Sequence, residues 1–177
     1  MSFRTHLLTC ILCAALTTGA CGTESLSSGL AQEASLATLD ATGARVLCET
    51  STDALAVLGA DICVTVGLMT IQTSVESCEQ AMLACESETA QNLDGQVDAA
   101  KSSCDAISAI EVVGASCTAT VGEWEACLNE NIDMYRDAMA RFSCADDPEE
   151  AAASPDMPNC DAYRAQGCTM PLASSGG

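Results

Sequence analysis

Histidine is almost absent from this chain: among its 177 residues there is only His6. Basic residues are also scarce, with six Lys and Arg against 25 Asp and Glu, and aromatic residues make up 3%. Such an acidic chain repels nucleic acid and anionic membrane surfaces, so we expect no nucleic-acid partner. Without histidine after residue 6, Ser-His and Cys-His nucleophile systems are excluded, and only carboxylates remain for acid/base chemistry near neutral pH.

Long apolar runs are missing from the start of the chain as well. The apolar stretch at 7–16 has ten residues, whereas a bilayer core needs about 20 helical residues. It follows Arg4 and leads to small residues before Cys21, an order typical of an export signal. The segment Thr18-Gly19-Ala20-Cys21 resembles the lipobox of bacterial lipoproteins, with Thr18 where Leu is common. The alternative is an ordinary cleaved secretory signal.

The lipobox resemblance implies a location and a membrane partner. It implies that residues 1–20 are a signal peptide and that the Cys21 thiol is acylated, which anchors the chain in the membrane through an N-terminal lipid. Gly22 stands where an inner-membrane retention Asp would follow, so the resemblance implies an outer-membrane lipoprotein, on the periplasmic side or at the cell surface. Residues 21–35 are small, polar and contain glycine, and we interpret them as a lipidated tether.

Cysteine is abundant, with 13 residues. Cys10 and Cys13 leave with the signal and acylation uses Cys21, so an even number remains, which in an exported chain predicts five disulfides. The alternative of a metal cluster is disfavoured because the only CxxC motif and the only histidine lie in the signal. We therefore expect no metal site and no cofactor. The predicted disulfide cysteines are Cys48, Cys63, Cys78, Cys85, Cys104, Cys117, Cys127, Cys144, Cys160 and Cys168.

Apolar residues recur at alternating steps of three and four, the period of a helix with one buried face. These stripes occupy residues 64–85, 93–107 and 121–142, and a less regular one lies near 36–48. Thr120 and Glu123 form a predicted capping box at the start of the third stripe. The β-branched residues at 62–66 would suit a strand, but the helical spacing continues through them.

The stripes predict an all-α fold: a disulfide-stapled antiparallel bundle of about four helices plus a short C-terminal helix. The domain spans residues 36–172, and the acidic, proline-containing segment 145–159 is a predicted loop. Within this loop we interpret the acidic residues 146–150 as solvated rather than as a calcium site. Residues 173–177 are a predicted flexible tail.

A turn centred on Gln91 between the helices at 64–85 and 93–107 predicts Cys78–Cys104 as the best disulfide pair. Comparing the heights of the other cysteines along neighbouring antiparallel helices in the same way suggests the pairs Cys63–Cys117 and Cys85–Cys144. Cys160 and Cys168 are eight residues apart, about 12 Å along a helix, which is too far for a disulfide. We expect them to tie the tail onto the bundle through Cys48 and Cys127.

The segment from Cys117 to Cys127, with Cys144 and the terminal Cys160/Cys168 pair, resembles uncharacterised cysteine-rich lipoproteins of Gram-negative soil bacteria. This resemblance implies location and stapled helices, and no activity. We expect a non-enzymatic envelope lipoprotein that acts as a structural or protein-interaction module, with a possible protein partner in the envelope. The alternatives are a ligand- or metal-binding bundle and a carboxylate-based enzyme. For the latter, Glu123 and Glu125 flank Trp124, but an exposed helix face accounts for them.

Overall fold

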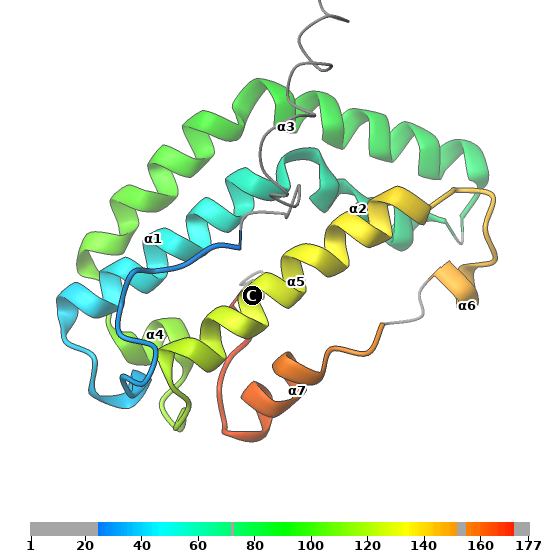
Figure 1. Ribbon diagram of the computed structural model, residues 1–177. Coiled ribbons are helices and arrows are strands. Elements are labelled where there is room, and N and C mark those ends of the chain that lie inside the picture. Colours follow the sequence, from blue (N-terminus) through cyan, green and yellow to red (C-terminus); the bar gives the residue numbers. More distant parts are fainter. Residues whose placement is uncertain (1–24, 72, 152–154, 172–177) are drawn as a thin grey trace, which may run out of the picture.

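The computed structural model describes residues 25–71, 73–151 and 155–171 (Figure 1). Its described residues form an all-α, disulfide-stapled helix bundle, as the apolar stripes predict, and the only β-type pairing among them is one isolated bridge between Ser35 and Thr120. The α-helices are α1 (Ala41–Leu58), α2 (Val64–Thr70), α3 (Val75–Ser103), α4 (Ala109–Val113), α5 (Val121–Arg141), α6 (Pro148–Ala151) and α7 (Pro158–Ala165). Short 3-10 segments are η2 (Leu36–Thr38), η3 (Gly59–Cys63) and η4 (Cys104–Ala106).

Helix α1 begins at an Asp40 N-cap, whose side chain accepts a hydrogen bond from the backbone N–H of Gly43 at 2.8 Å. The helix expected near 36–48 therefore starts five residues later and continues to Leu58. The segment 62–66 is helical, as expected, because η3 leads directly into α2. The stretch Ala41–Thr70 is long and apolar enough to cross a membrane by length and composition. In this structure it packs in the bundle, and its Cys48 and Cys63 are bonded to Cys104 and Cys85.

The expected turn at Gln91 is wrong, because α3 runs unbroken from Val75 to Ser103. No proline interrupts this stretch, and Thr89 joins the two apolar stripes into one half-buried face. The actual break lies earlier, between Thr70 and Val75, inside the stripe that predicted a single helix over 64–85. There Ser74 caps α3 by accepting a hydrogen bond from the backbone N–H of Ser77 at 3.0 Å.

Helix α5 matches its prediction closely. Thr120 and Glu123 form the expected capping box: the Glu123 N–H donates to the Thr120 hydroxyl at 3.3 Å, and the Thr120 N–H donates to the Glu123 carboxylate at 2.8 Å. The helix ends at Arg141, and Phe142 is its C-cap. Trp124 and Leu128 on this helix are fully buried.

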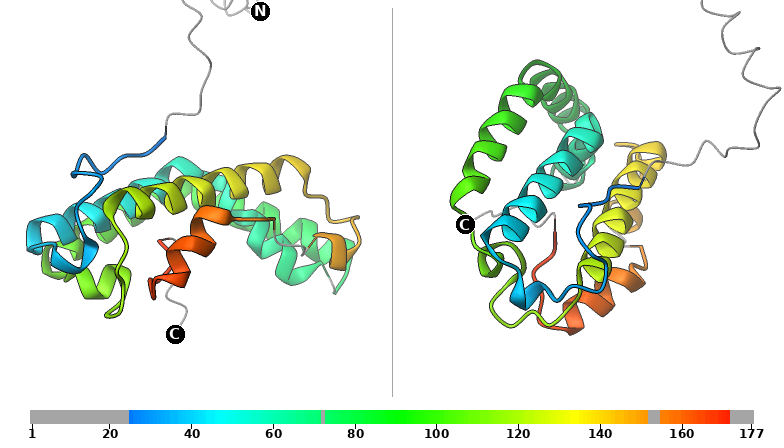
Figure 2. Two further views of the ribbon diagram at one scale, coloured as in Figure 1. Left: turned by 60° about the horizontal axis from the view of Figure 1, so that its bottom comes forward. Right: turned by 60° about the vertical axis from the view of Figure 1, so that its left-hand side comes forward.

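The main core lies around α5, between the N-terminal segment, α1, α4 and α7. In Figure 1 the helices α3, α1 and α5 follow one another across the molecule, with α7 beyond α5. Figure 2 shows the N-terminal segment lying along the seam between α1 and α5. A second, small cluster of Ile71, Cys78 and Cys144 lies where α2 meets α3. The expected short C-terminal helix is α7, and α6 forms within the predicted loop 145–159.

Candidate functional site

The predicted lipidation site Cys21 lies outside the described residues, as do the signal peptide 1–20 and the tail 173–177. The predicted tether 21–35 is described from Ser25 onward. We call residues 25–36 the strap, because this segment lies against α5 and does not extend away from the domain. It is the described part of the chain nearest to the proposed anchor.

The strap is held to α5 by hydrogen bonds along its length. Asn129 binds both backbone groups of Leu26: the Leu26 N–H donates to Asn129 Oδ1 at 2.7 Å, and Asn129 Nδ2 donates to the Leu26 carbonyl at 2.9 Å. Further along, the Val121 N–H donates to the Ala34 carbonyl at 2.9 Å, and the Leu36 N–H donates to the Ala119 carbonyl at 3.0 Å. The tether prediction is therefore wrong for residues 25–35. Composition suggested a linker because it gave no weight to the apolar side chains spaced along the segment, which pack on the main core: Leu26, Leu30 and Ala34.

Glu125 is the central contact between the strap and α5. Its side chain is only 6% exposed and accepts hydrogen bonds from the Ser28 N–H at 2.5 Å and the Ser28 hydroxyl at 2.6 Å. It also accepts one from Gln32 Nε2 at 2.5 Å and one from the Ser27 hydroxyl at 3.3 Å. Four donors match the roughly four acceptor positions of a carboxylate. The expectation that Glu125 occupies an exposed helix face is wrong, because the strap covers it.

The protonation of Glu125 follows from two opposing effects. Burial raises the pKa of its carboxyl. The hydrogen bonds from Ser28, Gln32 and Ser27 lower this pKa by more than burial raises it, so it lies below the usual 4.5. Glu123 stays at the surface, where the Thr120 N–H and then the Gln166 amide lower its pKa. Both carboxylates are ionised at neutral pH and engaged by structural partners. A general acid or base would need a pKa near the working pH.

All ten cysteines predicted for disulfides form five bonds, but the expected pairings differ. Cys78–Cys104 is wrong, as are the suggested Cys63–Cys117 and Cys85–Cys144 pairs. The unbroken α3 separates Cys78 from Cys104 by 26 residues, about 39 Å along a helix axis. Cys160 and Cys168 do tie the tail to the bundle, one through Cys127 as expected, but the other through Cys117 and not Cys48. The bonds are Cys48–Cys104, Cys63–Cys85, Cys78–Cys144, Cys117–Cys168 and Cys127–Cys160.

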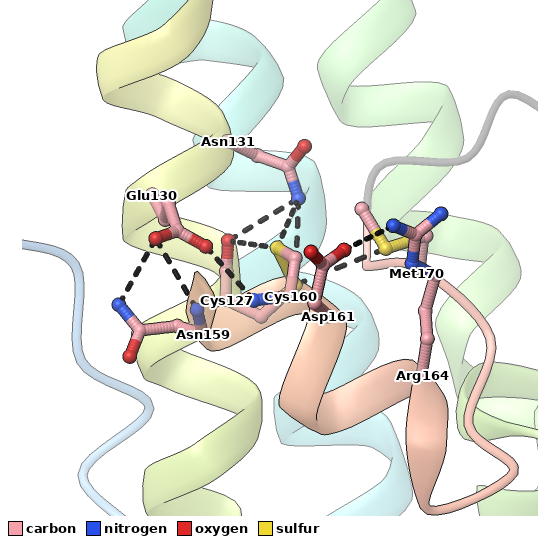
Figure 3. Close-up of polar contacts among 8 residues, drawn as sticks. All are labelled: Cys127, Glu130, Asn131, Asn159, Cys160, Asp161, Arg164 and Met170. Atoms are coloured by element: carbon pink, nitrogen blue, oxygen red, sulfur yellow. Dashed lines mark hydrogen bonds and ion pairs between the residues drawn. A yellow bond between two sulfur atoms is a disulfide. The ribbon is translucent and has the colours of Figure 1, made fainter. Parts of the chain in front are cut away.

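The junction of α5 and α7 combines a disulfide with a polar cap (Figure 3). Glu130 of α5 accepts hydrogen bonds from the backbone N–H of Cys160 at 2.8 Å and of Asn159 at 3.3 Å, and so caps the start of α7. The buried Asn131 amide donates to the Cys127 carbonyl at 3.2 Å and to the Cys160 sulfur at 3.3 Å. Cys127 and Cys160 have Cα atoms 4.4 Å apart. The sequence did not single out Glu130 or Asn131, since their partners on α7 lie about 30 residues away.

A groove opens where α2 and the end of α5 meet the acidic segment. It has a volume of about 300 Å³, and its apolar lining residues include Leu68, Ala138 and Phe142. Arg141, Asp146 and Glu150 contribute charged groups to its lining. Gly67 lets α2 approach closely here, because a Cβ at this position would stand 2.6 Å from Phe142 Cε1. We call this the α2–α5 groove; no motif in the sequence indicated it.

The described residues contain no group of three or more His, Cys, Asp or Glu side chains placed to hold a metal ion. Comparison with protein-family models gives no match, and comparisons with curated proteins and with solved structures give none either. Among the described residues, the candidate sites are the strap and the α2–α5 groove.

Proposed function

We propose that this protein is a membrane-anchored envelope lipoprotein that acts as a non-enzymatic structural or protein-interaction module. The observation that supports it most is the use of ten cysteines in five disulfides. Disulfides persist in oxidising compartments such as the bacterial periplasm and the cell surface. An even set remains only when Cys21 is left out, and that agrees with acylation of its thiol.

The non-enzymatic part of the proposal draws on Glu125. It is the only buried carboxylate among the described residues, the kind of group that could supply acid/base chemistry here. Its acceptor positions are filled by the strap, and its lowered pKa makes it a poor proton donor at neutral pH. A structural role in holding the strap accounts for its burial. Gly22 favours outer-membrane delivery by the same resemblance that suggests Cys21 as the lipid attachment site.

Detergent phase separation of the full chain tests the anchor. Made with its own signal in a bacterial host, the wild-type protein should enter the detergent phase, and Cys21→Ala should shift it to the aqueous phase. Thr23→Ala is the matched control, because it keeps the cysteine and should stay in the detergent phase. A wild-type protein found in the aqueous phase would contradict the anchor.

The α2–α5 groove supports a second candidate function, the binding of a small apolar ligand. Its volume lies at the lower end of the range of ligand pockets, and its lining combines apolar side chains with Arg141, Asp146 and Glu150. The probe is Nile red, an uncharged apolar dye, because Asp146 and Glu150 in the lining would repel an anionic probe. Ala138→Trp should fill the groove and abolish the fluorescence increase, whereas the exposed Ala140→Trp on the same helix should leave it unchanged. Equal fluorescence in both variants would contradict a site in this groove.

A further inference from the structure

The strap limits how far the domain can stand from a lipid attached to Cys21. Leu26 is fixed to α5 through both of its backbone hydrogen bonds to Asn129. An extended chain covers at most about 3.3–3.6 Å per residue, so the step from Cys21 to Ser25 spans about 14 Å at most. A helix with its side chains is about 10–12 Å across. An acylated Cys21 would therefore keep the start of the strap within little more than one helix diameter of the lipid surface.

The surface around the start of the strap suits such proximity. A shallow hollow there is lined by Ser25, Leu26, Ser27, Val57 and Arg136. Val57, at the end of α1, is 39% exposed and is one of the large apolar side chains that the described residues leave at the surface. Arg136 on α5 takes part in no ion pair among the described residues. In a chain with 25 acidic residues, this surface combines serine hydroxyls, an exposed valine and an unpaired cation.

We propose that this hollow, which we call the strap face, is the surface that the domain lays against the lipid headgroups. The inference rests on the proposed acylation of Cys21 and adds the orientation of the domain to it. A basic side chain is attracted to an anionic leaflet, and an interfacial apolar side chain adds buried area. Asp133 is exposed one turn before Arg136, and its negative charge weakens the attraction of Arg136 to an anionic leaflet. The short chain segment between Cys21 and the strap, and not strong charge attraction, determines which face of the domain meets the membrane.

The other end of the domain would then point away from the membrane. Residues 104 and 105 are tied to the first half of α1 by the Cys48–Cys104 disulfide and the Arg45–Asp105 ion pair at 3.3 Å. Helix α4, which follows them and carries Ile110, therefore lies near the start of α1 (Figure 1), whereas Val57 is close to the end of α1. Val57 lies nine residues beyond Cys48, about 14 Å further along the helix. Ile110 is 63% exposed, so it gives a matched reporter position away from the strap face.

Fluorescence quenching tests the orientation with the full acylated protein in vesicles that contain brominated phospholipid. Val57→Trp should lose much of its added emission to the bromines, whereas Ile110→Trp should keep it. Trp124 is fully buried and contributes the same background to both. Ser25→Trp is a second strap-face reporter for the case that Val57→Trp fails to fold, which intact mass of the five-disulfide protein would reveal.

A longer chain segment between Cys21 and the strap provides the control. Twelve Gly and Ser residues inserted between Gly22 and Thr23 should abolish the quenching of Val57→Trp while the protein still floats with the vesicles. Equal quenching of Val57→Trp and Ile110→Trp, or quenching of neither in floating protein, would overturn the orientation and leave the anchor intact. Protein that does not float with the vesicles at all would overturn the anchor and the orientation together.

Discussion

Helices α3 and α5 are the two longest helices of the described chain, and they are held in opposite ways. Helix α5 has 21 residues and buries seven of them, including Trp124 and Leu128. Helix α3 has 29 residues and buries only Cys78. The apolar face of α5 supplies much of the main core, whereas α3 offers a narrow stripe of cysteines and small or medium side chains.

Disulfides, and not buried apolar side chains, hold α3 to the rest of the bundle. Cys78 and Cys85 lie on this helix and Cys104 directly follows it, and each is bonded to a different element of the bundle. These bonds attach α3 near its start, in its first half and at its end. Helix α3 therefore depends on oxidation for its position, whereas α5 depends on burial of apolar surface.

Full reduction should have the largest effect and break the α3 side first. Each disulfide contributes about 2–4 kcal/mol, so the five together rival the roughly 5–15 kcal/mol by which domains are stable. We expect the reduced protein to lose most of its helical circular dichroism and its cooperative melting. The oxidised protein in the same buffer is the control. A reduced protein that melts cooperatively near the oxidised temperature would show that the apolar core suffices.

Truncation of one leucine on each helix tests whether α5 and α3 differ in how much apolar burial stabilises them. Leu128→Ala on α5 should destabilise the oxidised protein by about 2–5 kcal/mol, because it empties space in a packed core. Leu83 on α3 is 65% exposed, so Leu83→Ala should change the stability by no more than about 0.5 kcal/mol. Urea unfolding of the two variants measures both values, and similar losses would contradict the division between the helices.

Loss of a single disulfide should separate the two regions locally. The double variant Cys78→Ala/Cys144→Ala should lower the stability by about 2–4 kcal/mol. Amide hydrogen exchange should become faster in α2 and in the first half of α3, while α5 near Trp124 stays protected. As a control, Cys127→Ala/Cys160→Ala should instead speed exchange in α7. Uniform acceleration across the molecule in the first variant would speak against this local role.

Removal of the charge on Glu125 should release the strap. Glu125→Gln keeps the shape of the side chain but places an amide where the four donors converge, at a cost of about 1–3 kcal/mol. Faster hydrogen exchange at Ser28 and Leu30 should accompany the loss in urea stability. Glu79→Gln on the exposed side of α3 is the matched control and should leave both measurements unchanged.

The smallest effect is the dependence on pH. The pKa values of Glu125 and Glu123 lie below the usual 4.5 in the folded protein, so their ionised forms stabilise it at neutral pH. That contribution should be constant above about pH 6 and be lost as the pH falls through 4.5 and below. Between pH 6 and 8 the melting temperature should stay nearly flat, since no histidine follows His6. Glu125→Gln should reduce the fall of the melting temperature at acid pH. An unchanged fall would show that other carboxylates cause it.

The helical class, the set of bonded cysteines and the limits of α5 could be predicted from the sequence. These depend on short-range relations: a three-four spacing describes one face of one helix, and the Thr120–Glu123 box closes within a single turn. These short-range relations do not show which other part of the chain covers the apolar face of a helix. The stripe over 64–85 kept its spacing across the break between α2 and α3, so the spacing alone could not show where the chain turns.

The pairing of the sulfurs, the position of the strap and the burial of one carboxylate could not be predicted in this way, because they depend on tertiary packing. Cys78 joins Cys144 across 66 residues, and Glu125 receives Ser28 across 97. Contacts at such separations depend on how the helices stack, and the stacking follows from the burial of all apolar faces together. Glu123 and Glu125 stand two positions apart on one helix, and only the packing of the strap distinguishes an exposed cap from a buried anchor.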